Sequence, residues 1–452
     1  MTQINSKTKE TLKSLAGSSI ATFATTVIRF GLRLVKNAIF TRALGPADRG
    51  IFNLLTTIPD LIVSFGNIGF GTGCMYLISD RKYDIRKIVG NMLVFTVVAG
   101  LIMVVIGYVL FHFEGILQGN TATVQTLSPF AFLIIPFVLL QTFGEDMLLG
   151  SNKIHFLNKI RTLFSFIPIV LLAVFWFLTG KPLLSALLAW SISVVVVSVS
   201  TIIYVSRQHD YKYGLSGVYF KEALSYGGRG FFSIFAGVLV KRVDYLFVSS
   251  MLGTEALGLY GVSVSMAEII LSIPQALSLP FLPIRLGLAK KDASELTPLV
   301  IRTVVFAMLL ICLGVAVGGK LIVIVMFGKK FLNAYHPLLW LLPGMIALSI
   351  HDFLKSDMYS RNRPGLVSWA EGAAVTINIG MNYFYFIPTY GIEGAAISSS
   401  VAYWISTIVL LFYYRSLTQI SIKGVLFIKW SEIKQMMRYF KNRGKKIGHS
   451  PP

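Results

Sequence analysis

Long apolar runs separated by short polar segments fill most of the chain. Two of them, residues 88–111 and 183–205, each contain more than twenty consecutive residues without an acidic or basic side chain. A helix needs about 20 apolar residues to cross about 30 Å of hydrocarbon, whereas barrel strands give short alternating segments. The pattern predicts an all-α polytopic membrane protein.

Polar and basic connections divide these runs into twelve predicted transmembrane helices. Residues 1–13 are too polar for a signal peptide, so we expect the first span to remain as a membrane anchor. The spans are expected near 14–40, 51–78, 88–112, 124–148, 162–179, 183–206, 224–250, 258–284, 297–318, 333–354, 366–387 and 393–414.

Composition and charge fit this topology. The 452 residues are 55% hydrophobic and 13% charged, and the formal net charge is +21. Most of the Lys and Arg residues lie in alternate connections, on the same side as both chain ends, which predicts cytoplasmic termini. The positive charge therefore faces the lipid bilayer, and no nucleic-acid partner is expected.

An internal repeat relates the two halves. "LGPADRGIFNLL" begins at Leu44 and "LGTEALGLYGVS" begins at Leu252, so that at a spacing of 208 Gly45 matches Gly253. Because each half holds six helices, both halves enter the membrane in the same direction. Transporters with such halves hold the substrate between them, so we expect two six-helix lobes related by a pseudo-two-fold axis.

The expected domain organisation follows from the repeat. A cytoplasmic N-terminal stub precedes the first lobe, and a cytoplasmic linker connects the lobes. A basic cytoplasmic tail then lies against anionic headgroups or is solvated. The expected ranges are 1–13 for the stub, 14–206 for the first lobe, 207–223 for the linker, 224–416 for the second lobe and 417–452 for the tail.

The first span carries three cations, Arg29, Arg33 and Lys36. At i, i+4 and i+7 they form one stripe about 10 Å long, while the face with Val35 and Ile39 is apolar. A charge at the bilayer centre costs roughly 2.5–3.5 kcal/mol on insertion scales. The stripe must therefore face protein or water.

The second half repeats this arrangement with Lys241, Arg242 and Asp244, and Lys241 matches Arg33 at the same spacing. The favoured interpretation is a cationic cavity for an anionic ligand, because the planar fork of Arg suits phosphate. The alternative is that the cations snorkel or pair with Asp60 and Glu268.

Intramembrane acids are candidates for ion coupling. Asp60 and Glu268 occupy matched positions in the second helix of each half, and either pair with the cations or bind H+ or Na+ as the coupling ion. Asp244 belongs to the same group, and Asp352 beside His351 is a weaker candidate.

No catalytic or metal-binding pattern appears. The chain lacks HExxH and GxSxG, its histidines have no ligand spacing, and Cys74 and Cys312 lie in apolar stretches as packing residues. "GNIGFGTG" at 66–73 lacks the GK[ST] ending of a phosphate-binding loop, so close helix packing is the better interpretation. We expect no enzyme, no metal and no cofactor.

The segment "FTRALGPADRGIFNLLTTIPDLIVSFGNIGFG", with "MFGKKFLNAYHPLLWLL" and "NRPGLVSWAEGAAVTINIGMNYFYFIPTYGIEGAAISSSVAYW" later on, resembles the polysaccharide-transport, Wzx-type branch of the MOP flippase superfamily. The resemblance covers roughly residues 14–416 and implies a MATE-like fold. One departure is Arg49, where an aromatic residue is usual, which places an extra charge at the outer rim. The chain has no room for the two further helices usual in lipid II flippases.

The resemblance implies a flippase of the bacterial inner membrane for O-antigen or capsule synthesis. Its substrate would be an oligosaccharide linked to a polyprenyl pyrophosphate such as undecaprenyl pyrophosphate, and its partner the polysaccharide polymerase machinery. The cations that fit the family's basic cavity are Arg29, Arg33, Lys36, Lys241 and Arg242.

Three other functions remain open. A cation-coupled multidrug exporter of the same superfamily should have acids and aromatic residues in its cavity, which here is basic. A membrane polymerase of sugar chains needs a large outer loop, and none is present. A non-transporting scaffold is compatible with the sequence.

Overall fold

The computed structural model describes residues 6–80, 82–112, 121–208, 212–286, 290–361 and 363–427. Within these ranges the side chains at 6–29, 110–112, 121, 276–286 and 290–296 are outside the description. The expected tail, 417–452, therefore lies largely outside the described residues.

The described chain is almost entirely helical, as the apolar runs predict. The helices of the first half are α1 (Ser6–Gly66), α2 (Phe70–Ser79), α3 (Ile85–His112), α4 (Thr121–Leu133), α5 (Ile135–Gly150), α6 (Ile154–Thr179) and α7 (Pro182–Arg207). Those of the second half are α8 (Gly217–Leu286), α9 (Lys290–Phe327), the 3₁₀ turn η1 (Lys329–Ala334), α10 (Tyr335–Ser360), α11 (Pro364–Met381), the π-helical η2 (Asn382–Phe386), α12 (Ile387–Thr418) and α13 (Ile422–Leu426).

Two of the long helices turn sharply at matched glycines. Gly45 in α1 has φ 74° and ψ 174°, and Gly253 in α8 has φ 85° and ψ 179°. Both conformations lie in a region that L side chains rarely adopt. The internal repeat seen in the sequence therefore corresponds to a repeated backbone geometry.

The helices accommodate the predicted spans. Within the described residues, seven helices are long and apolar enough to cross a membrane, or up to nine if each bent pair is one span. The bent pairs are α1 with α2, at 61°, and α4 with α5, at 42°. The kinked α1 and α8, and the run from α11 to α12, are each long enough for two of the twelve expected crossings.

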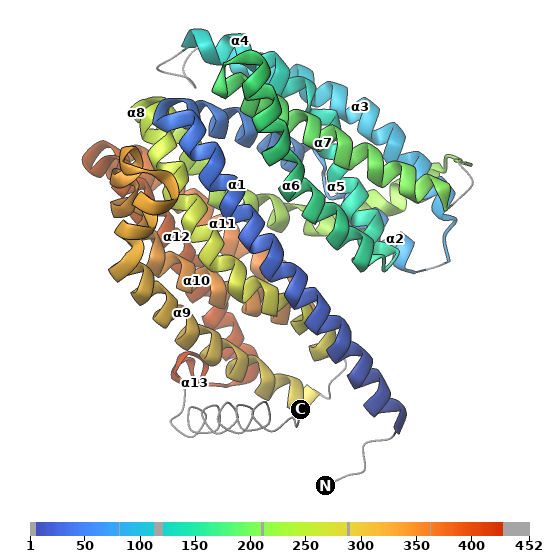
Figure 1. Ribbon diagram of the computed structural model, residues 1–452. Coiled ribbons are helices and arrows are strands. Elements are labelled where there is room, and N and C mark those ends of the chain that lie inside the picture. Colours follow the sequence, from blue (N-terminus) through green and yellow to red (C-terminus); the bar gives the residue numbers. More distant parts are fainter. Residues whose placement is uncertain are drawn as a thin grey trace, which may run out of the picture.

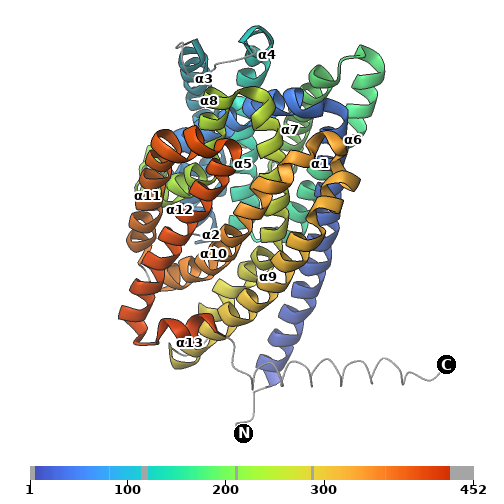
Figure 2. The ribbon, with the colours of Figure 1, turned by 90° about the vertical axis from the view of Figure 1, so that its left-hand side faces the viewer.

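The two halves of the chain form two groups of helices (Figure 1). The helices α3 to α7 lie on one side, α9 to α12 lie on the other, and α1 and α8 run between them. In both views (Figure 1, Figure 2) α13 and the first turns of α1 lie at one end of the molecule, and the kinks of α1 and α8 lie at the opposite end, here called the kink end.

The two halves touch most closely through small residues. A Cβ added to Gly50 in α1 would lie 1.7 Å from the Thr254 carbonyl oxygen, and one added to Gly258 in α8 would lie 1.9 Å from the Pro46 carbonyl oxygen. Only glycine permits this approach of the backbones. Because Gly50 and Gly258 are themselves a matched pair, the repeat also defines this contact.

A second close contact joins α2 to the start of α8. A Cβ on Gly69 would lie 2.2 Å from the Gly227 carbonyl oxygen, and one on Gly73 would lie 1.9 Å from that of Ala223. This confirms that the glycines of 66–73 serve helix packing.

Candidate functional site

The carboxylate of Glu268 in α8 connects the two halves. Its Oε2 accepts a hydrogen bond of 3.0 Å from Nη2 of Arg33 in α1, and its Oε1 lies 2.7 Å from Nη2 of Arg242 in α8. The side chain of Arg33 is 47% exposed and that of Arg242 is 27% exposed. These three residues form the interlobe charge cluster. One arginine from each half therefore converges on a single anion, at a position that remains open on one side.

The expected stripe of cations in the first span divides. Arg33 reaches α8, whereas Nζ of Lys36 lies 5.5 Å from the ring centroid of Phe164 in α6. Arg29 belongs to α1, but its side chain lies outside the described residues. On the opposite face Val35 and Ile39 are 49% and 38% exposed, which fits the predicted apolar face toward lipid.

The acid matched to Glu268 is unpaired in the described residues, although it lies within electrostatic range of Arg242 and Glu268. Asp60 in α1 is exposed and lines a cavity of about 340 Å³ in the first half. In the same cavity Arg161 donates two hydrogen bonds, of 2.6 and 3.1 Å, to Oε2 of Glu145. Within the described part of the chain, no cation lies within 4.0 Å of the Asp60 carboxylate.

Lys241 lines a second polar cavity, of about 220 Å³, in the second half. There Nζ of Lys355 donates a 2.8 Å hydrogen bond to Glu371. Asp352 accepts a 3.1 Å hydrogen bond from Gln275, and its Oδ1 lies 3.9 Å from Nδ1 of the buried His351. Lys241 and Asp352 thus line a cavity of the second half, and Lys241 also lies within electrostatic range of Glu268 in the interlobe charge cluster.

Asp244 is enclosed in the second half, with 1% of its surface exposed. Its carboxylate accepts hydrogen bonds from the hydroxyl of Tyr260, from the hydroxyl of Ser399 at 3.1 Å, and from the backbone N–H of Tyr245 at 2.9 Å. A buried carboxylate with this many donors is satisfied where it stands, so its position is that of a structural residue.

Arg49 and Arg42 lie where the sequence pattern did not place them. Arg49 lies four residues after the kink at Gly45, at the kink end, but it is not an exposed charge on a rim: the side chain is buried, with its guanidinium 5.5 Å from the ring of Phe52. Arg42 donates to the carbonyl oxygens of Met326, at 2.9 Å, and of Val325. The last carbonyls of a helix lack intrahelical partners, so Arg42 fastens α1 to the end of α9.

The remaining chemistry is sparse. Cys74 and Cys312 are buried and unbridged. In the described ranges, no three His, Cys, Asp or Glu side chains are grouped so that they could hold a metal ion. The interlobe charge cluster therefore stands out as the candidate functional site.

Comparison with known proteins agrees with this geometry. The profile of the family described as "Polysaccharide biosynthesis protein" matches residues 15–282. The chain belongs to this family. Within the polysaccharide biosynthesis proteins, it is 22% identical over 420 residues to the probable low-salt glycan biosynthesis flippase Agl15 of Haloferax volcanii, covering 90% of this chain and 84% of the relative. It is 23% identical over 393 residues to the putative O-antigen transporter of Shigella flexneri, covering 82% and 91%.

Solved structures identify the fold of this polysaccharide biosynthesis protein. Lipid II flippase MurJ in an inward closed conformation superimposes with a TM-score of 0.74 at 17% identity, covering 90% of this chain and 89% of MurJ. An inward-facing multidrug resistance MATE transporter of the MOP superfamily superimposes with a TM-score of 0.67 at 15% identity, covering 89% of this chain and 98% of the transporter. The MATE-like fold implied by the sequence is confirmed.

Proposed function

We propose that the protein moves an oligosaccharide linked to a polyprenyl pyrophosphate from the cytoplasmic to the outer leaflet of a bacterial inner membrane. The observation that carries the proposal is the convergence of Arg33 and Arg242, one from each half, on Glu268. The family and the two relatives, a glycan flippase and an O-antigen transporter, support the substrate class.

A pyrophosphate suits the interlobe charge cluster because it offers several anionic oxygens to the two guanidinium groups. Each guanidinium can bind two oxygens at once, and such charge-assisted bonds are the strong ones. In the empty protein Glu268 supplies the anion. During transport the pyrophosphate takes over both arginines, and Lys36 and Lys241 add to the positive potential of the cavity.

The same contacts support alternating access. At the kink end the halves are joined by the glycine contact of Gly50 with Gly258 and by Arg42 on the end of α9. The charge cluster is partly exposed, so we propose that the cavity in this state opens to the side on which the chain begins. The basic connections support the assignment of that side, with both termini, to the cytoplasm.

Three further features complete the proposal. A coupling ion, H+ or Na+, binds at one or more of Asp60, Glu268 and Asp352, since acids in membrane spans are typical of such sites. Asp244 already accepts hydrogen bonds from Tyr260, Ser399 and the backbone of Tyr245, and it has a structural role in packing. The polysaccharide polymerase machinery receives the product.

The test is the flipping rate in proteoliposomes with an oligosaccharide-linked polyprenyl pyrophosphate labelled on its sugar. Arg33→Ala and Arg242→Ala should each slow flipping at least about tenfold, because each removes a charge-assisted hydrogen bond to the pyrophosphate. Arg415→Ala, which removes an exposed arginine at the end of α12, is the control and should flip at the wild-type rate.

Thermal stability must be measured on the same samples. Wild-type flipping by a well-folded Arg33→Ala, Arg242→Ala double variant would overturn the cationic site. A wild-type protein that does not flip the labelled substrate would overturn the function itself.

A further inference from the structure

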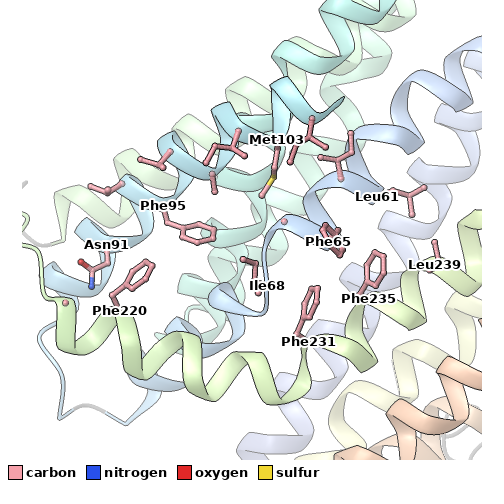
Figure 3. Close-up of a pocket in the computed structure, with 18 of the residues that line it drawn as sticks. Leu61, Phe65, Ile68, Asn91, Phe95, Met103, Phe220, Phe231, Phe235 and Leu239 are labelled. Atoms are coloured by element: carbon pink, nitrogen blue, oxygen red, sulfur yellow. The ribbon is translucent and has the colours of Figure 1, made fainter. Parts of the chain in front are cut away.

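A deep apolar groove lies beside the interlobe charge cluster. It has a volume of about 980 Å³ and is formed by α1 and α3 of the first half and by α8 of the second (Figure 3). Aromatic rings from both halves build it: the ring of Phe65 lies 6.1 Å from that of Phe231 and 5.3 Å from that of Phe235. The groove therefore follows the seam between the two halves.

The groove is open along α3. Val98 and Ile102 line it, yet each is 55% exposed. Lining residues run from Asn91 to Ile106, which is about 22 Å of helix at 1.5 Å per residue. Since the hydrocarbon core is about 30 Å thick, the groove follows this span through most of the bilayer and faces lipid.

One end of the groove borders the charge cluster. Leu239 and Leu246 of α8 line the groove, and Arg242 lies three and four residues from them, so all three are neighbours on the helix surface. At the other end Asn91 exchanges hydrogen bonds of 2.8 and 3.1 Å with the backbone of Ser216. The groove is thus apolar along its length, and its lining residues Leu239 and Leu246 are neighbours of the cationic Arg242 on α8.

We propose that this groove holds the polyprenyl chain of the substrate while its pyrophosphate is bound by Arg33 and Arg242. The proposal rests on the proposed function. A polyprenyl chain is long, flexible and free of polar atoms, and it must change leaflet together with its head group. A phospholipid that stays in one leaflet has no need of a groove running through both, whereas a chain that changes leaflet needs one connected to its anion site.

Neighbouring residues of α3 provide matched variants. Ile102 lines the groove and is 55% exposed, while Leu101 is 60% exposed and is not among the lining residues. Ile102→Trp fills the groove, and Leu101→Trp places the same ring in lipid. Ile102→Trp should slow flipping of the labelled substrate about tenfold, the effect of overpacking an occupied site, and Leu101→Trp should leave the rate unchanged.

A second readout locates the chain. In nanodiscs of phosphatidylglycerol and phosphatidylcholine, a polyprenyl pyrophosphate with a diazirine midway along its chain should label the groove face, at Val98 and Ile102 and at Phe65 and Phe231. Unlabelled polyprenyl pyrophosphate should remove the labelling. Two results would overturn the proposal. One is labelling confined to Val97 and Leu101. The other is equal labelling of the groove by a diazirine-bearing phosphatidylglycerol, if polyprenyl pyrophosphate does not displace that lipid.

Binding of inorganic pyrophosphate separates the two proposals, because it requires the arginines and not the groove. Both tryptophan variants should bind it as the wild type does. Normal flipping by Ile102→Trp with impaired flipping by Arg33→Ala would overturn the groove and leave the proposed function intact.

Discussion

The two halves of the molecule agree in backbone geometry and differ in charge. Gly45 and Gly253 adopt nearly the same unusual conformation. The acids Asp60 and Glu268 are matched at the same spacing of 208 residues. Glu268 bonds directly to arginines of both halves, whereas Asp60 lines a cavity of the first half and senses Arg242 and Glu268 only at longer range.

This difference in charge between the halves shows which residues of the repeat are constrained by packing. The matched glycines shape the contact between the halves, so each half constrains the other. Asp60 and Lys241 line cavities, where a side chain can change without moving the backbone. A substrate with a lipid chain at one end and sugars at the other has no symmetry, and an asymmetric arrangement of charges suits it.

The largest expected effect is a difference in stability between variants of the two matched acids. Glu268→Gln should lower the free energy of unfolding by about 3 kcal/mol, at the low end for a broken buried pair because Arg33 is half exposed. Asp60→Asn should change it by less than about 0.5 kcal/mol. Denaturant unfolding of the two variants in detergent measures both changes in the free energy of unfolding. Equal decreases would mean that the two acids contribute equally to stability.

A smaller and symmetric effect is expected at the contact between the halves. Gly50→Ala and Gly258→Ala each place a Cβ within 2 Å of a carbonyl oxygen of the other half. Overpacking of this kind costs about 2 kcal/mol, so both variants should lose similar stability in the same unfolding experiment. A large loss in only one of them would contradict a two-fold contact.

The smallest expected effect is at the kinks. Gly45→Ala and Gly253→Ala should each cost about 1 kcal/mol, because the added Cβ disfavours a positive φ, while beyond the adjoining backbone it would have no heavy atom within 4 Å. Gly314→Ala, at an uncrowded helical glycine of α9, is the control and should be neutral or stabilising. Losses that match this control would show that the kinks tolerate any residue.

Much of the fold could be predicted because its signals are local. Apolar runs predicted the long apolar helices, and the Leu-Gly turns at 44 and 252 marked the kinks. The apolar face of the first span could be predicted from helical periodicity, since Val35 and Ile39 are exposed where lipid would lie.

The site could be predicted only in part, because its contacts join distant segments. Periodicity placed Arg33 and Lys36 on one face, and the alternative interpretation of the cations named Glu268 as a partner, which Arg33 and Arg242 confirm. The contact of Lys36 with Phe164 was not predicted. The groove was missed because its signal is divided between helices: a lipid-facing α3 and the phenylalanines Phe220, Phe231 and Phe235 at the start of α8.

The kink of α1 also acts as a lever. Arg33 stands about twelve residues before Gly45, an arm of about 18 Å along the helix. A rotation of about 10° about the kink carries the guanidinium about 3 Å on such an arm, as far as the 3.0 Å that now separates it from Glu268. A small change in two backbone torsions is therefore enough to break the ion pair of Arg33 with Glu268, while the contact of Gly50 with Gly258 on the other side of the kink stays in place.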